Sequence, residues 1–172
     1  MKAFVPEVVT LPDRKMLTIT SIGDPNVVGE GIFGALYGTA YGTKFKTFKP
    51  QGIKLELGKL VAMWPDAHLK PKNEWTDIWA VPVPDYVVEA DVIQKEPSNP
   101  VTLVTWPGGK YAQILHLGTY AEEGPTIKIL HDYIENVVGI PMAGVIGMHE
   151  EEYLTKPDSK VVKTIIRYRL GV

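Results

Sequence analysis

Three consecutive glutamates, Glu150 to Glu152, stand just before Tyr153 in a segment whose other residues are typical of a β-strand. In a strand, successive side chains point to opposite faces, so Glu151 would share a face with His149 and Tyr153 while its two neighbours share the other. Charges that discourage edge pairing on a solvated strand would explain the two neighbours. Glu151 fits that explanation less well. In an aromatic pocket it would hold a cationic ligand or, with its pKa raised by burial, transfer protons.

Tryptophan and tyrosine side chains are numerous enough to line such a pocket. The chain has 4 tryptophans and 8 tyrosines. These side chains could simply be core, but their N–H and O–H groups need hydrogen-bond partners when buried, so a wet cleft lined by aromatic rings is a fair alternative.

Metal and nucleophile sites have weaker support. The four histidines are dispersed, and the sequence HEEEY is not the H-E-x-x-H zinc motif because position 153 is tyrosine. No G-x-S-x-G elbow surrounds a serine, so a catalytic triad is improbable. The sequence GEGIFG at residues 29–34 matches G-x-G-x-x-G, but no crossover to a parallel strand follows it. We therefore predict no metal and no cofactor.

Composition favours one globular domain spanning residues 1–172. Hydrophobic residues make up 45% of the 172 residues, and the net charge is −2 with no lysine- or arginine-rich run. This charge pattern gives no electrostatic footprint for nucleic acid. Cysteine is absent, which excludes disulfides and thiol catalysis. No apolar run is long enough for a signal peptide or a membrane span, so we expect a cytoplasmic protein that does not enter the membrane.

The elements that would position these residues occur twice in the same order. Residues 14–22 predict a strand, residues 27–45 a helix with Asn26 as its N-cap, and residues 59–64 and 77–86 two further strands. A strand, a helix and two strands follow again in the second half. The order predicts an α+β fold of two βαββ repeats, at about residues 7–92 and 99–172.

Each predicted helix carries a distinctive pattern. In the first helix, aromatic residues recur every four positions beside a stripe of three glycines, which suggests close approach to something flat, such as a sheet. In the second helix, the apolar residues Ile127, Leu130, Ile134 and Val137 would share one face.

Several longer segments resemble the GyrI-like small-molecule-binding family, which is related to the effector-binding domains of multidrug-responsive transcription regulators. These segments are PEVVTLPDRKMLTI, GDPN followed by LYGTAY, GGKYAQILHLGTYAEEGPTIKILHDYIE, and EEEYLTKPDS followed by KTIIRYRL. The resemblance spans nearly the whole chain. It implies two βαββ modules in a pseudo-two-fold arrangement, whose antiparallel sheet and two main helices form a concave ligand cleft.

The resemblance also implies site residues. The glutamate and tyrosine of the family's E-x-Y-L motif fall on Glu151 and Tyr153, and the tyrosine that closes its H-x-G-x-Y motif falls on Tyr120. The flanking glutamates leave open whether Glu150, Glu151 or Glu152 faces the cleft. Further wall candidates among the aromatic residues are Trp64, Trp79, Tyr37 and Tyr41, followed by Trp106 and Tyr111.

Three functions follow from the pattern and the resemblance together. The first is binding of bulky aromatic, often cationic, small molecules around Glu151. The second, implied by standalone relatives, is hydrolysis of cyclopropane-bearing or similar electrophilic natural products, with Glu151 and Tyr120 as catalytic residues. The third, implied by the family's name, is inhibition of a protein partner such as DNA gyrase, which the charge pattern does not support. The oligomeric state stays open.

Overall fold

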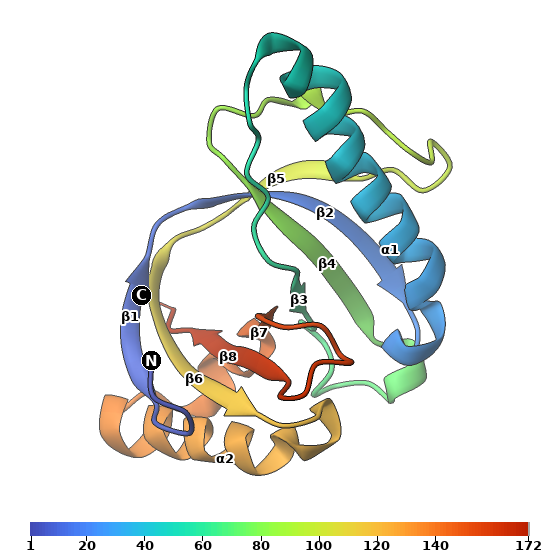
Figure 1. Cartoon of the computed structure of the whole chain (residues 1–172). Helices are drawn as coiled ribbons and strands as arrows, with labels where there is room; N and C mark the ends of the chain where they lie inside the picture. Colours follow the sequence, from blue (N-terminus) through green and yellow to red (C-terminus); the bar gives the residue numbers. More distant parts are fainter. Residues whose placement is uncertain (172) are drawn as a thin grey trace.

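Eight antiparallel strands form one curled sheet in the computed structural model, which describes residues 1–171, with Glu30 through its backbone alone (Figure 1). The strand order is β1-β6-β8-β7-β3-β4-β2-β5. The strands are β1 Glu7–Leu11, β2 Arg14–Ile22, β3 Val61–Met63, β4 Thr76–Val83, β5 Thr102–Trp106, β6 Gly109–Leu117, β7 His149–Tyr153 and β8 Lys163–Arg169. The predicted α+β class is confirmed.

Two modules, β2-α1-β3-β4 and β6-α2-β7-β8, make up this sheet, as the repeated order predicts. The helices are α1 Pro25–Gly42 and α2 Glu123–Tyr133. The modules meet where β3 pairs with β7, with Ala62 opposite Glu151. Strand β1 pairs with β6 and strand β5 pairs with β2, so each remaining strand lies at an outer edge of the sheet beside the first strand of a module.

Both helices pack on the outer face of the curled sheet (Figure 1). Alternate residues of β2 and β4, among them Leu17 and Trp79, join α1 in one core, and alternate residues of β6 and β8, among them Ile114 and Ile166, join α2 in another. Met16 belongs to a smaller cluster on the inner face. The period of two in each strand thus separates a helix-covered face from the inside of the curl.

Short helical turns complete the chain. They are η1 Thr43–Phe48, η2 Lys49–Gln51, η3 Lys72–Glu74, η4 Glu89–Asp91, η5 Tyr120–Glu122, η6 Ile134–Val138, η7 Met142–Gly144 and η8 Ile146–Met148. Among the described residues, no helix combines the length and the hydropathy that crossing a bilayer requires.

Helix α1 begins two residues earlier than the sequence indicates. Asp24 is the N-cap, and its carboxylate accepts a hydrogen bond from the backbone N–H of Asn26 at 2.9 Å. The prediction of Asn26 as the cap is wrong because Pro25 has no N–H to lose and can occupy the first helical position.

Two of the three glycines in the α1 stripe, Gly38 and Gly42, lie against the segment that follows β4 and not against the sheet, while no atom lies within 4 Å of a Cβ added at Gly34. A Cβ added at Gly38 would come within 2.6 Å of Cγ of Lys95, and one at Gly42 would lie 3.6 Å from the carbonyl oxygen of Ile93. The hydroxyl of Thr39, between these glycines, accepts a hydrogen bond from the backbone N–H of Lys95 at 3.0 Å. The helix is therefore closely approached as expected, but by the loop around Ile93 and Lys95 and not by a sheet.

The apolar face of α2 changes its phase towards the end. Leu130 and Ile134 are fully buried, as predicted, but Val137 is 69% exposed and Val138 packs on the core instead. The cause is the π-helical turn η6, which has more residues per turn than an α-helix and so rotates later side chains. The prediction for Val137 is wrong for this reason.

Substituting Gly108 by alanine should destabilise the fold by about 1–3 kcal/mol through overpacking. A Cβ at this position would lie 2.6 Å from the carbonyl oxygen of Leu11 and 2.6 Å from the carbonyl carbon of Pro12, which are backbone atoms that cannot swing away. Urea denaturation measures the loss. Gly144→Ala is the matched control because no atom lies within 4 Å of its added Cβ. Equal stability of the two variants would contradict the steric argument.

Candidate functional site

A cavity of about 1530 Å³ lies between α1 and α2. Side chains from β3, β4 and β7 contribute to its wall, so it sits over the junction of the two modules. Its aromatic lining consists of Phe33, Tyr37, Tyr41, Trp64, Trp75, Trp79, Tyr120, Tyr153 and Tyr168. This volume and lining suit a drug-sized or larger organic molecule.

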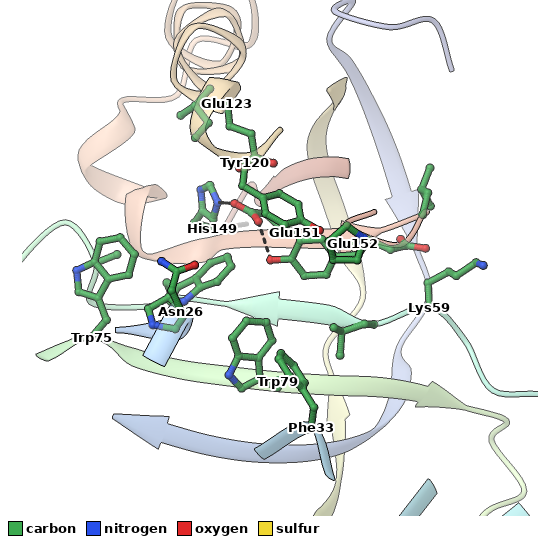
Figure 2. A pocket seen from close by; sticks show the side chains of 18 of the residues that line it. Asn26, Phe33, Lys59, Trp75, Trp79, Tyr120, Glu123, His149, Glu151 and Glu152 are labelled. Carbon is green, nitrogen blue, oxygen red and sulfur yellow. Dashed lines mark hydrogen bonds and ion pairs between the residues drawn. The ribbon is translucent and has the colours of Figure 1, made fainter. Parts of the chain in front are cut away.

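The aromatic rings of the wall hold one another in place. Phe33 and Trp79 pack edge to face with ring centroids 4.8 Å apart, and Trp64 and Trp79 do so at 5.7 Å (Figure 2). Across the cavity, Tyr120 packs edge to face on Tyr153 at 5.5 Å. Edge-to-face packing fixes each ring plane, so the wall is largely formed before any ligand arrives.

Glu151 lies in this wall and is 6% exposed (Figure 2). Its Oε2 accepts a hydrogen bond from the Tyr153 hydroxyl at 2.8 Å, and its Oε1 lies 2.8 Å from His149 Nε2. All three residues come from β7 at alternate positions, as the strand period predicts. Hydrogen bonds to both oxygens stabilise the ionised form of a buried carboxylate.

A hydrogen-bonded chain runs from Glu151 to the far side of the cavity. His149 Nδ1 lies 2.7 Å from the Tyr168 hydroxyl, which lies 2.8 Å from His131 Nε2. Because a carboxylate only accepts, His149 Nε2 donates to Glu151. With a neutral His149, Tyr168 then donates to His149 Nδ1 and accepts from His131. With a charged His149, both directions reverse, so a proton can move along the chain without loss of a hydrogen bond.

Burial changes the pKa of two groups beside this hydrogen-bonded chain, His131 at its end and the Tyr153 hydroxyl on Glu151. Burial is the main cause that lowers the pKa of His131, followed by the neighbouring His149. Burial, with the nearby charge of Glu151, also raises the pKa of the Tyr153 hydroxyl well above its ordinary value. Tyr153 therefore stays protonated and donates to Glu151.

Glu123, at the start of α2, brings a second carboxyl group to the cavity. It is 5% exposed, and its Oε1 is buried without a hydrogen-bond partner among the described residues. Burial, and then the negative charge of Glu151, raise the pKa of Glu123 to about 9. The cavity thus contains a neutral carboxyl group near an ionised one.

Replacing Glu123 by glutamine should flatten the pH dependence of stability. The pKa of Glu123 rises from 4.5 to about 9 on folding, so the folded state keeps a proton that the unfolded chain releases. This contribution is complete at low pH and is lost as pH rises towards 9. We expect the stability of the wild type relative to Glu123→Gln to fall between about pH 5 and about pH 8 in urea denaturation. Parallel curves of unfolding free energy against pH for the two proteins would contradict this expectation.

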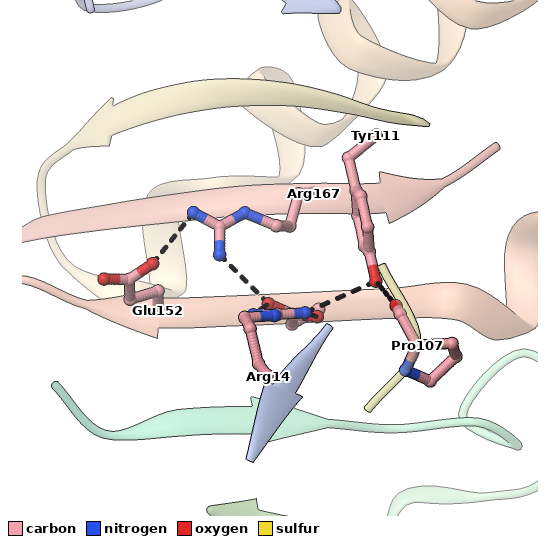
Figure 3. Close-up of polar contacts among 6 residues, drawn as sticks. Arg14, Pro107, Tyr111, Glu152 and Arg167 are labelled. Atoms are coloured by element: carbon pink, nitrogen blue, oxygen red, sulfur yellow. Dashed lines mark hydrogen bonds and ion pairs between the residues drawn. The ribbon is translucent and has the colours of Figure 1, made fainter. Parts of the chain in front are cut away.

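The neighbours of Glu151 on β7 point into the curl of the sheet. Glu150, 1% exposed, receives a bidentate pair of hydrogen bonds from Arg14 Nη1 and Nη2 at 2.7 and 2.8 Å, and a further one from Arg167 Nη1 at 3.0 Å. Arg167 Nη2 reaches Glu152 Oε2 at 2.8 Å (Figure 3). Glu152 also borders the cavity, but its carboxylate is neutralised by this pair.

Most predicted wall residues meet in the cavity, and two do not. Trp106 and Tyr111 lie inside the curl, where their rings flank the Arg14 guanidinium at 5.6 and 5.5 Å. The Tyr111 hydroxyl donates to the carbonyl oxygen of Pro107 at 3.0 Å (Figure 3). Both residues occupy the inner face of their strands, so the structure places them outside this cavity. Glu151, Tyr153, Tyr120, Trp64, Trp79, Tyr37 and Tyr41 all line the cavity.

Sequence reasoning missed Glu123, His131, His149 and Tyr168 as site residues. The strand period placed His149 on the face of Glu151, so that signal was present. Glu123 carries no distinct signal in the sequence, because acidic residues are common in the first turn of a helix. His116, by contrast, is a satisfied structural residue, with Nδ1 2.8 Å from the Thr126 hydroxyl.

Within the described part of the chain, no cluster of three or more histidine, aspartate or glutamate residues could hold a metal ion. Three lysines, Lys59, Lys72 and Lys156, stand at the cavity margin, and all are exposed. Solvent screens their charges more than those of the buried carboxyl groups.

Comparison with solved structures gives the same fold. A conserved protein from Listeria innocua is 24% identical with a TM-score of 0.78, over 96% of this chain and 92% of that one. A hydrolase from Listeria innocua is 22% identical with a TM-score of 0.75, over 98% and 92%. The SAV2435 protein bound to tetraphenylphosphonium is 12% identical with a TM-score of 0.50, over 95% and 92%.

Comparison of sequences assigns the family. No curated protein matches the chain significantly. The model of the GyrI-like small molecule binding domain matches residues 4–168, which is nearly the whole chain. The chain belongs to the GyrI-like small-molecule-binding domain family.

Proposed function

We propose that this protein binds bulky aromatic cations in the cavity between α1 and α2, with Glu151 as the counter-charge. The observation that carries the proposal is a buried carboxylate in a wall of aromatic rings. Both Glu151 oxygens are hydrogen-bonded, to Tyr153 and His149, which favours the ionised state.

The lining suits an aromatic cation on two counts. A buried negative charge attracts a cation more strongly than an exposed one does, because little water screens the pair. The faces of tryptophan and tyrosine rings add cation–π attraction within about 6 Å. A neutral ligand of the same shape would gain only the apolar contacts.

A structural neighbour supports this ligand class. The structure of SAV2435 contains tetraphenylphosphonium, a bulky aromatic cation, and SAV2435 shares the fold at a TM-score of 0.50. That ligand is therefore a reasonable first probe for the present cavity.

Isothermal titration calorimetry tests the proposal with tetraphenylphosphonium and the neutral triphenylphosphine oxide. We expect the cation to bind at least about tenfold more tightly, which corresponds to ~1.4 kcal/mol. Equal affinities would contradict the role of the carboxylate. No binding of either compound would contradict the proposed ligand class.

Hydrolysis of a strained cyclopropanoid electrophile is a second candidate, favoured by the two carboxyl groups with opposite protonation. Ionised Glu151 would take a proton from a water molecule while the oxygen of that water attacks a ring carbon. The ring C–C bond would break, and its electron pair would pass to a conjugated oxygen that the Tyr120 hydroxyl stabilises. A neighbour with the same fold is a hydrolase.

Mass spectrometry separates the two candidates. A hydrolase converts a cyclopropane-conjugated dienone into its water adduct faster than buffer does, and Glu151→Gln should lower that rate about 10²- to 10⁴-fold. Recovery of the intact compound from wild-type protein at the uncatalysed rate would rule out hydrolysis of this probe.

A further inference from the structure

We propose that Glu123 and Glu151 form a two-carboxyl subsite that selects aromatic cations bearing N–H donors, such as amidines, over quaternary cations, and releases a proton when it binds them. This inference rests on the proposed function and names the ligand class that the cavity prefers.

Unused acceptor capacity at the two carboxyl groups is the first argument. Glu123 Oε1 is buried in the cavity wall with no hydrogen-bond partner among the described residues. The proton of the neutral Glu123 carboxyl group faces Glu151, so an N–H donor of a ligand can take the place of that proton and bond to both groups. Each Glu151 oxygen accepts one hydrogen bond, from Tyr153 or from His149, and a carboxylate oxygen can accept a second.

Placement of the two carboxyl groups is the second argument. Glu123 comes from the first turn of α2 and Glu151 from β7, and Figure 2 shows both in the same part of the cavity wall, with Tyr120 and His149. A planar amidinium carries N–H donors on two nitrogens, so it can reach both carboxyl groups at once. A quaternary ammonium or phosphonium has no N–H and gains only charge attraction and ring contacts.

Proton balance follows from the charges around Glu123. Burial and the negative charge of Glu151 keep Glu123 protonated in the free protein. A cation placed between the two groups would offset both effects, so Glu123 would ionise and its proton would leave to solvent. The complex would then contain two carboxylates, and the positive amidinium between them would offset their mutual repulsion.

Other titratable groups face Glu123 and Glu151, and the protons that they release must be distinguished from a proton released by Glu123. Tyr120 on η5 and Tyr153 on β7 have raised pKa values and stay neutral. His149 on β7 contacts Glu151, and His131 on α2 lies at the end of the relay through Tyr168 on β8. A proton released from these histidines would persist in a Glu123→Gln variant, whereas one released from Glu123 would not.

The test uses two probes of matched size and charge, 4-phenylbenzamidine and trimethyl(4-biphenylyl)ammonium. Calorimetric titration of the wild type in buffers of different ionisation enthalpy gives the affinity and the number of protons released. Near pH 7 we expect the amidine to bind about tenfold more tightly and to release up to one proton. Its affinity should rise with pH up to about 9, because the complex contains deprotonated Glu123.

The Glu123→Gln variant completes the test. It should lose the proton release and the preference for the amidine but keep its affinity for the quaternary probe. Two results would overturn the inference: the wild type binds both probes equally and releases no proton, or the variant releases as many protons as the wild type. Either result would leave the proposed function intact. Failure of both probes to bind would overturn the proposed function and this inference with it.

Discussion

Glu151→Gln should raise the dissociation constant for tetraphenylphosphonium by about 10- to 100-fold, or ~1.4–2.8 kcal/mol. Glutamine keeps the shape of the side chain and one acceptor oxygen but removes the negative charge. Because Glu151 is 6% exposed, that charge acts on a bound cation with little screening by water. Isothermal titration calorimetry gives the change, and binding of triphenylphosphine oxide should stay the same.

Glu96→Gln is the matched control for this experiment. Glu96 is exposed and lies outside the cavity lining, so the same change of charge should leave both affinities unaltered. A loss of affinity of equal size in both variants would show that only the net charge of the protein matters. An unchanged affinity in Glu151→Gln would show that the carboxylate does not hold the cation.

Glu150→Gln should destabilise the folded protein by about 3–5 kcal/mol. Glu150 is 1% exposed and neutralises the Arg14 and Arg167 guanidinium groups, which come from different modules. Without its charge, the two arginines keep their positive charges in a buried environment with only Glu152 to offset them. Urea denaturation monitored by circular dichroism measures the loss.

Glu152→Gln is the matched control on the same strand. The Glu152 side chain is 25% exposed and accepts from Arg167 alone, at 2.8 Å, so its loss should cost clearly less. If the Glu150 variant were no less stable than the Glu152 variant, the buried ion pairs would not hold the inside of the curl together.

Local sequence patterns account for most of the elements. Alternation over residues 14–22 predicts β2 to the residue, and the glutamate run predicts both the strand β7 and the opposite faces of Glu150 and Glu151. These features could be predicted because the period of a strand is a local property.

Features that depend on contacts between distant segments could not be predicted in this way. The pairing of β1 with β6 and of β5 with β2 is set by packing of the whole sheet. The position of Trp106 and Tyr111 inside the curl could not be predicted, because composition says nothing about which side of a strand a lone aromatic residue occupies. Glu123 reaches the site only because α2 crosses the end of the cavity.

A crystal structure of the protein with tetraphenylphosphonium tests the central claim most directly. We predict that the phosphonium lies in the cavity between α1 and α2, with its phenyl rings against Trp64, Trp79 and Tyr153 and with Glu151 as one of the nearest carboxylates. Density for the cation elsewhere, for example in the smaller hollow beside Phe45 and Lys49, with the cavity free of it, would contradict the account.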